Sequence, residues 1–253
     1  MAHGLNIRST GTGRSTLYVV GHGGREAIEV FDVDASGAIP ALTWTGCVMM
    51  PDGMVANSVA SFADGSLVIT VPLYPDRTIT HAMAGETTGA VFRWSPSDQV
   101  VRRIAGTELP YANGIEVSAD GQEIFVASSG EFTVTAFSNT NPAERLRVSE
   151  PMAIVPDNLH MGSDGRLITA GLVADDDVCG NVSGPEVFSL EEFAACPRPF
   201  IVEALNPQTL EIEDIAVGAA NPAFSNITMA IEIGGELWIG TFSGDRIAYR
   251  AID

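Results

Sequence analysis

One layout recurs along this chain and restricts the folds open to it. A polar residue heads a short apolar segment, and an Asp-Gly pair follows seven residues after the head: Asn57 precedes Asp64-Gly65, and Asn113 precedes Asp120-Gly121. A third copy is headed by Asp157, with Asn158 beside it, before Asp164-Gly165; two weaker copies are headed by Asn226, with a Gly-Gly turn in place of Asp-Gly, and by His3, which stands in the place of the Asn. The heads recur at intervals of roughly 40 to 70 residues, a period typical of the blades of a β-propeller.

The segments around the turns have the composition of short β-strands. They are rich in β-branched and aromatic residues and are bounded by Gly, Pro, Asp or Ser. Clear examples are residues 15–22, 26–34, 65–73, 89–95, 131–138 and 235–244. Only residues 189–195 favour a helix. Many short strands suit a sandwich, a barrel or a propeller, and the repeat selects the propeller. We therefore predict an all-β fold, with residues 1–253 forming one β-propeller domain.

Charge and hydropathy exclude several classes of protein. The formal net charge of -19 repels nucleic acid and anionic membranes, so a nucleic-acid partner is not expected. No apolar run approaches the ~18 to 20 residues of a membrane span, and residues 1–20 lack the layout of a signal peptide. We expect a soluble chain. The sequence leaves open the oligomeric state and the compartment, which is cytoplasmic, or extracellular if an upstream segment directs secretion.

The three cysteines divide into a pair and a single residue. Cys179 and Cys196 bracket an irregular insert that a disulfide could close, but the sequence does not reveal the redox compartment, so both the bridged and the free forms stay open. Cys47 has no such partner. We interpret it as a small buried hydrophobic residue.

The heads of the repeats carry oxygen atoms suited to a metal. If the strand after each head is the innermost of its blade, the heads converge at the mouth of the central channel. Amide and carboxylate oxygens are the ligands that calcium prefers. Asn and Asp also start strands simply because they favour turns. However, the Asp-Gly pairs already supply the turns, so the shared register favours a calcium site. Its expected ligands are Asn57, Asn113, Asp157 and Asn158.

Three stretches resemble a known family. YANGIEVSADGQEIFVAS (111–128), PDNLHMGSDG (156–165) and HGLNI (3–7) are similar to the corresponding stretches of the paraoxonase and arylesterase family of calcium-dependent lactonases, and more distantly to gluconolactonase-like and strictosidine-synthase-like propellers. The resemblance implies a six-bladed propeller of the calcium-dependent phosphotriesterase type. It also implies a catalytic calcium in the tunnel, held by the four residues named above.

The resemblance extends to a pair of histidines. The family's HG motif matches His3-Gly4, and its VV-x-H strand matches the strand that ends at His22. The implied catalytic residues are His3, as the base that takes a proton from water, and His22, which orients it. Tyr111, beside Asn113, is expected to help line the substrate pocket. His81 and His160 match nothing in the motif and are interpreted as structural or surface residues.

Departures from the family pattern leave alternatives open. The family's remaining calcium ligand is a Glu upstream of the HG motif, which has no counterpart here, and the chain is short for six blades; we expect the first blade to be missing or incomplete. Ser58 stands where the family has an Asp that binds a second, structural calcium. The expected function is calcium-dependent hydrolysis of small-molecule lactones or aryl esters. The alternatives are a gluconolactonase-type sugar lactonase, which does not need the histidine pair, and a non-catalytic propeller that binds a small ligand or a protein partner.

Overall fold

A computed structural model describes residues 1–183 and 188–252 of the chain. Its strands form successive antiparallel sheets, each a meander of neighbouring strands. The first sheet contains β1 (Ala2–Gly11), β2 (Arg14–Gly21), β3 (Ala27–Asp34) and β4 (Ala41–Met49). The second contains β5 (Val59–Ser61), β6 (Leu67–Val71), β7 (Ala90–Trp94) and β8 (Arg102–Arg103).

The same order continues through the rest of the chain. The third sheet contains β9 (Ala112–Val117), β10 (Glu123–Ser128), β11 (Thr133–Ser138) and β12 (Arg145–Val148). The fourth contains β13 (Leu159–Met161), β14 (Leu167–Leu172), β17 (Phe200–Leu205) and β18 (Ile212–Gly218). The fifth contains β19 (Ile227–Ile233), β20 (Glu236–Thr241) and β21 (Ala248–Ala251).

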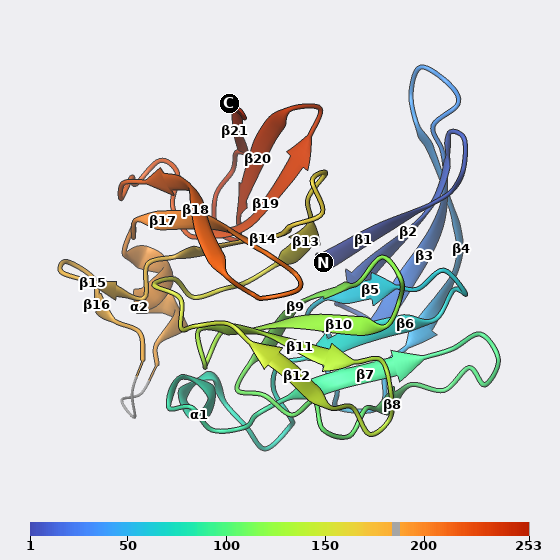
Figure 1. Ribbon diagram of the computed structural model, residues 1–253, viewed down its shortest axis with the longest axis horizontal. Coiled ribbons are helices and arrows are strands. Elements are labelled where there is room, and N and C mark those ends of the chain that lie inside the picture. The colour runs from blue at the N-terminus through green and yellow to red at the C-terminus, as the bar shows by residue number, and fades with distance from the viewer. Residues whose placement is uncertain (184–187, 253) are drawn as a thin grey trace.

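The five sheets are the blades of a propeller, which confirms the predicted all-β architecture. The first strands of successive sheets are neighbours, β1 with β5, β5 with β9, β9 with β13 and β13 with β19. Figure 1 shows the blades arranged in chain order around a centre near which the N-terminus lies. Each of the five sequence repeats corresponds to one blade of the described residues. A sixth blade, implied by the resemblance, is not confirmed.

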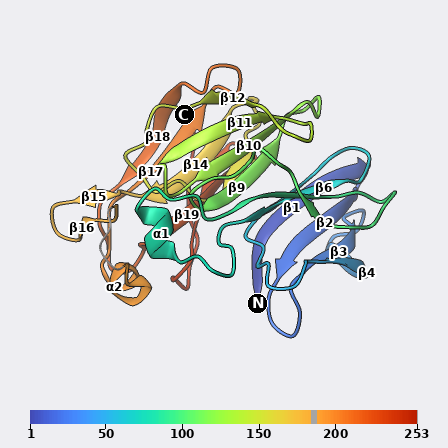
Figure 2. The same ribbon diagram turned by 90° about the horizontal axis from the view of Figure 1, so that it is seen from below.

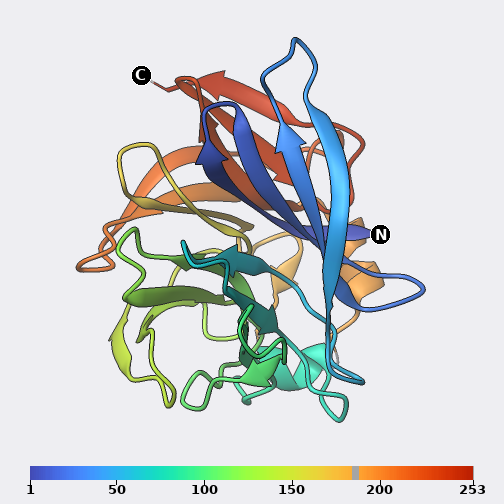
Figure 3. The ribbon, with the colours of Figure 1, turned by 90° about the vertical axis from the view of Figure 1, so that its right-hand side faces the viewer.

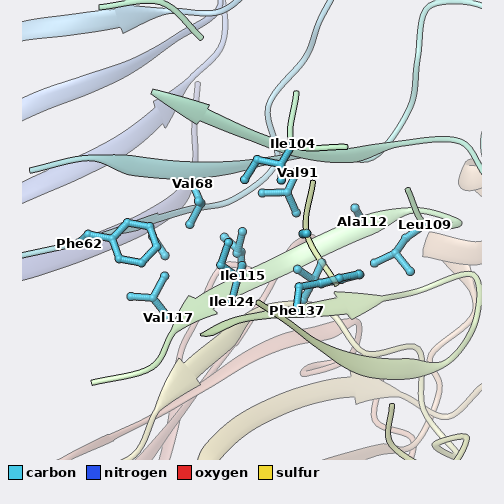
Figure 4. Close-up of a cluster of buried hydrophobic side chains, with 13 residues drawn as sticks. Phe62, Val68, Val91, Ile104, Leu109, Ala112, Ile115, Val117, Ile124 and Phe137 are labelled. Carbon is cyan, nitrogen blue, oxygen red and sulfur yellow. The ribbon is translucent and has the colours of Figure 1, made fainter. Parts of the chain in front are cut away.

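The core lies between the blades because strand residues alternate between the two faces of a sheet. On β6, Leu67 and Ile69 pack toward the first blade, whereas Val68 packs toward the third. Figure 4 shows the cluster of buried side chains between the second and third blades, in which Val68 lies near Ile115 and Ile124. Burying each such side chain contributes about 1.5–3 kcal/mol. Inter-blade packing therefore holds the first strands in their ring.

The Asp-Gly pairs form the tight turns that the sequence predicts. Gly65, Gly121 and Gly165 adopt positive φ angles of 83°, 70° and 83°. An L-residue other than Gly rarely adopts this conformation. In the first of these turns, Asp64 accepts a hydrogen bond from the backbone N–H of Ser66 at 2.9 Å. The turns are structural, as expected.

Two short helices and a hairpin interrupt the blades. Helix α2 (Leu190–Ala195) confirms the helix predicted for residues 189–195, whereas α1 (Ile79–Met83) was not predicted. The hairpin consists of β15 (Asp175–Asp176) and β16 (Gly180–Asn181). Both helices and the N-terminus lie on one side of the ring, as the perpendicular views of Figure 2 and Figure 3 show. In the part of the chain that the structure describes, no helix is long and apolar enough to cross a membrane.

The cysteines resolve as one bridge and one free thiol. Cys179 and Cys196 form a disulfide with Cα atoms 5.9 Å apart, which decides between the two open possibilities. The bridge closes the insert that carries α2; residues 184–187 of this insert, like Asp253, lie outside the described residues. Cys47 is only half-buried on β4, an outer strand of the first blade, so the prediction that it is buried was wrong.

Candidate active site

The predicted metal ligands stand at the starts of neighbouring inner strands. Asn57 precedes β5, Asn113 lies at the start of β9, and Asp157 and Asn158 directly precede β13. Asn57 and Asn113 are only 5% and 3% exposed. The structure therefore brings the four predicted ligands to one end of the inner strands. Whether they bind metal stays a prediction.

Backbone hydrogen bonds tie these strand starts together across the blades. Gly4 N–H donates to the carbonyl of Asn57 at 3.1 Å, and Gly114 N–H donates to the carbonyl of Asp157 at 3.0 Å. A Cβ atom on Gly4 would lie 2.5 Å from that Asn57 oxygen, and one on Gly114 would lie 2.2 Å from the Asp157 oxygen. These glycines are required because the backbones approach too closely for any side chain. The Gly of the Asn-Gly pair and the Gly of the HG motif thus have the same physical role.

Hydroxyl groups from the second strands hold the heads in place. Thr70 on β6 donates to the carbonyl of Asn113 at 2.5 Å, and Thr169 on β14 donates to the carbonyl of Asn158 at 2.9 Å. Ser129, just beyond β10, accepts a hydrogen bond from Asn113 Nδ2 at 3.0 Å. This contact orients the amide of Asn113. Among the described residues, no donor reaches its buried Oδ1.

Asp157 is the one carboxylate in this set. Burial raises the pKa of Asp157 to about 7, although a hydrogen bond from the Asn113 side chain opposes the shift. Burial, together with the nearby negative charge of Asp157, also raises the pKa of Tyr111 to about 12. Tyr111 is thus close enough to Asp157 to feel its charge, whereas its place in a substrate pocket stays a prediction. Asn158 Nδ2 lies 3.2 Å from Asp157 Oδ1.

These residues fit a hard cation. The donor set consists of amide oxygens and one carboxylate, with no sulfur, and the orphaned Oδ1 of Asn113 would gain a partner from an ion. Among residues 1–183 and 188–252, no cluster of three or more His, Cys, Asp or Glu side chains could hold a metal. The neutral amides would therefore supply most of the ligand oxygens.

His3 and His22 are in direct contact. His3 Nδ1 lies 3.0 Å from His22 Nε2, and the rings meet edge to face with centroids 5.2 Å apart. The strand pair β1–β2 creates this contact, because His3 lies near the start of β1 and His22 follows the end of β2. Partial burial, and then the neighbouring His22, lower the pKa of His3. His3 is therefore neutral near pH 7, as a base requires.

A third residue, which the sequence reasoning missed, extends the pair. His22 Nδ1 lies 2.6 Å from Glu26 Oε2. An ionised carboxylate only accepts hydrogen bonds, so the proton of a neutral His22 is on Nδ1 and its Nε2 accepts from His3 Nδ1. His3 Nε2 then keeps a free lone pair. We call Glu26, His22 and His3 the relay. A Glu four residues after a His in a loop gives no sequence signal, because only the turn brings them together.

The two remaining histidines have other surroundings. His81 Nδ1 accepts a hydrogen bond from the backbone N–H of Thr78 at 3.1 Å and caps α1, which confirms a structural role. His160 is half-buried on the inner strand β13, and burial lowers its pKa to about 4. It is therefore neutral near pH 7.

Comparison with known proteins shows which family this chain belongs to. The family model of the SMP-30/gluconolactonase/LRE-like region matches residues 10–179. This chain belongs to the SMP-30/gluconolactonase/LRE-like family. The matched region contains the four predicted metal ligands, together with His22 and Glu26. Comparison with curated proteins gives no match.

Solved structures agree with the family at the level of the fold. A luciferin-regenerating enzyme is 13% identical, with a TM-score of 0.56, over 97% of this chain and 73% of the other. A gluconolactonase from Xanthomonas campestris is 16% identical, with a TM-score of 0.53, over 94% of this chain and 69% of the other. A structure of a nidogen/laminin complex also matches, with 10% identity and a TM-score of 0.56, over 99% of this chain and 76% of the other. At such identities the likeness establishes the propeller fold alone.

Proposed function

We propose that this family member is a calcium-dependent hydrolase of lactones or aryl esters. The observation that carries the proposal is the pairing of two features at one end of the inner strands. One is the set of four predicted oxygen ligands, of which Asn57 and Asn113 are buried and Asn113 Oδ1 is unsatisfied. The other is the relay, whose first strand is tied to the Asn57 backbone through Gly4. The resemblance to paraoxonases supports assigning the propeller to the calcium-dependent phosphotriesterase type.

The four strand-start residues Asn57, Asn113, Asp157 and Asn158 would hold the ion. When bound, calcium would polarise the carbonyl group of the substrate and stabilise the negative charge that develops on its oxygen. Asp157 would supply the one negative charge among these ligands. Tyr111 would line the pocket as a neutral phenol, because burial and the nearby charge of Asp157 raise its pKa to about 12.

The relay would activate the attacking water. His3 would accept the proton of the water at Nε2, the ring nitrogen that the relay leaves free. The positive charge on His3 would then be stabilised through His22 by the carboxylate of Glu26, which is 2.6 Å from His22. In the second half of the reaction, His3 would return the proton to the leaving alkoxide or phenoxide. His3 is the catalytic residue of this scheme, and His22 and Glu26 position it.

The family match favours a second candidate, a gluconolactonase-type sugar lactonase. Such an enzyme would use the same metal but not the relay. The two candidates differ in the effect of His3→Gln. A relay-dependent hydrolase loses activity and keeps its calcium affinity, whereas a gluconolactonase-type enzyme keeps both.

Calcium calorimetry on the full chain, with hydrolysis of a lactone and of phenyl acetate, tests the proposal. We expect calcium binding and hydrolysis that a chelator abolishes, with activity lost in His3→Gln. The matched control is His81→Gln, which changes a histidine that caps α1. Absence of both calcium binding and chelator-sensitive turnover would leave a non-catalytic propeller as the better description.

A further inference from the structure

We infer that Asn226 is a fifth protein ligand of the calcium site. This inference rests on the proposed function, and it goes beyond the ligand set that the resemblance implies. Asn226 heads the fifth repeat, and the family model's match ends at residue 179. The place of Asn226 in the ring, the contacts of its side chain and its backbone conformation all support this role.

Asn226 occupies the same place in its blade as Asn158 does in the preceding one. Asn158 directly precedes the inner strand β13, and Asn226 directly precedes the inner strand β19. The two strand starts are also bonded to each other. Both the backbone N–H and Nδ2 of Asn158 donate to the carbonyl of Thr228, at 3.0 and 3.1 Å. Asn226 therefore lies two residues before Thr228, which is hydrogen-bonded to the predicted ligand Asn158.

The side chain of Asn226 is held in the same way as that of Asn113. Asn226 Nδ2 donates to Ser243 Oγ at 2.8 Å, as Asn113 Nδ2 donates to Ser129 Oγ at 3.0 Å. Both serines lie just beyond the second strand of their blades. A second hydrogen bond, from Asn226 Nδ2 to the carbonyl of Ala194 at 2.8 Å, fixes the amide further. In both asparagines a hydrogen bond to a serine hydroxyl orients the amide nitrogen and leaves the amide oxygen free for another partner.

The free oxygen of Asn226 is buried. The residue is 2% exposed, and within the described part of the chain no donor reaches its Oδ1. Leaving a buried acceptor without a partner costs about 1–3 kcal/mol. Asn113 and Asn226 are the two asparagines of the described residues with a buried, unpartnered Oδ1. A cation would satisfy both oxygens.

The backbone of Asn226 is also unusual. Its φ angle is +58°, in the left-handed region that Gly adopts most readily and that Asn adopts more often than most other residues. If the turn alone mattered, Gly would fit this position equally well. A turn does not require a side chain whose amide nitrogen donates two hydrogen bonds and whose oxygen is buried.

Calcium calorimetry on Asn226 variants of the full chain tests this inference. Asn226→Gly removes the side chain while allowing the positive φ. We expect the Kd for calcium to rise at least about tenfold. The matched control is Asn206→Gly, which removes an exposed amide from an outer turn.

Europium luminescence adds a readout that a purely structural role would not change. The decay rates in water and in heavy water report how many water molecules remain on the bound ion. Asn226→Gly should add about one water, because the lost protein oxygen is replaced by solvent. If Asn226→Gly leaves both the calcium Kd and the hydration unchanged while the wild type binds calcium, the inference is overturned and the proposed function stands. If the wild type binds no calcium, both are overturned.

Discussion

Glu26 Oε2 lies 2.6 Å from His22 Nδ1, at one end of a hydrogen-bonded chain whose other end is His3. This contact assigns the protons of both rings and leaves His3 Nε2 as the free acceptor. The resemblance implied two histidines, and the structure adds the carboxylate that orients them.

Replacing Glu26 should impair turnover more than substrate binding. In Glu26→Gln the negative charge that stabilises a protonated relay is lost, so we expect kcat to fall at least about tenfold with KM little changed. Steady-state kinetics of lactone hydrolysis measures both. Glu26→Asp should restore part of the rate. Glu29→Gln is the control, because Glu29 pairs with Arg25 at 2.7 Å and not with the relay. A rise in KM at constant kcat would contradict the prediction.

Replacing Asp157 should weaken calcium binding but raise the stability of the metal-free protein at pH 8. In Asp157→Asn the one carboxylate of the predicted ligand set is lost, so the calcium affinity should fall about 100-fold. Because the pKa of Asp157 is raised to about 7, its protonated form stabilises the folded state at low pH. This stabilisation is lost as the pH rises through about 7. At pH 8 without metal, the variant should therefore melt at a higher temperature than the wild type. Thermal unfolding with chelator and with calcium checks both outcomes.

Glu203 provides a pH-dependent stability test away from the predicted ligands. It is 3% exposed, and burial, followed by the nearby charge of Asp214, raises its pKa to about 7. In the unfolded chain the carboxyl group of a Glu has a pKa of about 4.3. The stability that protonated Glu203 contributes to the fold is therefore lost as the pH rises from about 4.3 to about 7. Glu203→Gln should raise the unfolding free energy at pH 8 by on the order of 3 kcal/mol and have little effect at pH 4. Denaturant unfolding at the two pH values measures this, with the exposed Glu211→Gln as control. An equal gain at both pH values would disprove the assignment.

Gly114→Ala should damage the join between the third and fourth blades. The added Cβ would lie 2.2 Å from the carbonyl oxygen of Asp157, a backbone atom that cannot move aside alone. We expect a loss of about 1–3 kcal/mol in unfolding free energy, together with weaker calcium binding. Gly11→Ala is the matched control, since nothing lies within 4 Å of its added Cβ. Similar losses in both variants would show that the close approach is unimportant.

The disulfide should stabilise the insert that carries α2. The bridged cysteines are 17 residues apart, for which the loop-closure model gives about 3 kcal/mol. We expect a reductant to lower the melting temperature of the wild type and to leave a Cys179→Ser, Cys196→Ser double variant unchanged. Cys47→Ser should behave as the wild type, because that thiol is free. Equal responses of the wild type and the double variant would refute this prediction.

The sequence alone determined the repeat and therefore the fold class. A hairpin turn is local: an Asp-Gly pair permits the positive φ at Gly65 or Gly121 wherever the strands lie. The copies of this layout, three of them with an Asp-Gly turn, could therefore be read as successive blades of a propeller. The same register identified Asn57 and Asn113 as strand heads. Helix α1 escaped prediction because a five-residue helix held by its cap leaves little periodic pattern.

Only the tertiary structure decided which polar groups act together. Glu26 meets His22 across a turn, and Asn226 receives its orientation from Ser243 and Ala194, residues that the sequence does not connect with it. An oxygen without a donor is likewise invisible in a sequence, because a missing partner is a property of the surroundings in space. Local backbone chemistry sets the turns and strands of this protein, whereas burial and long-range hydrogen bonding set its candidate site.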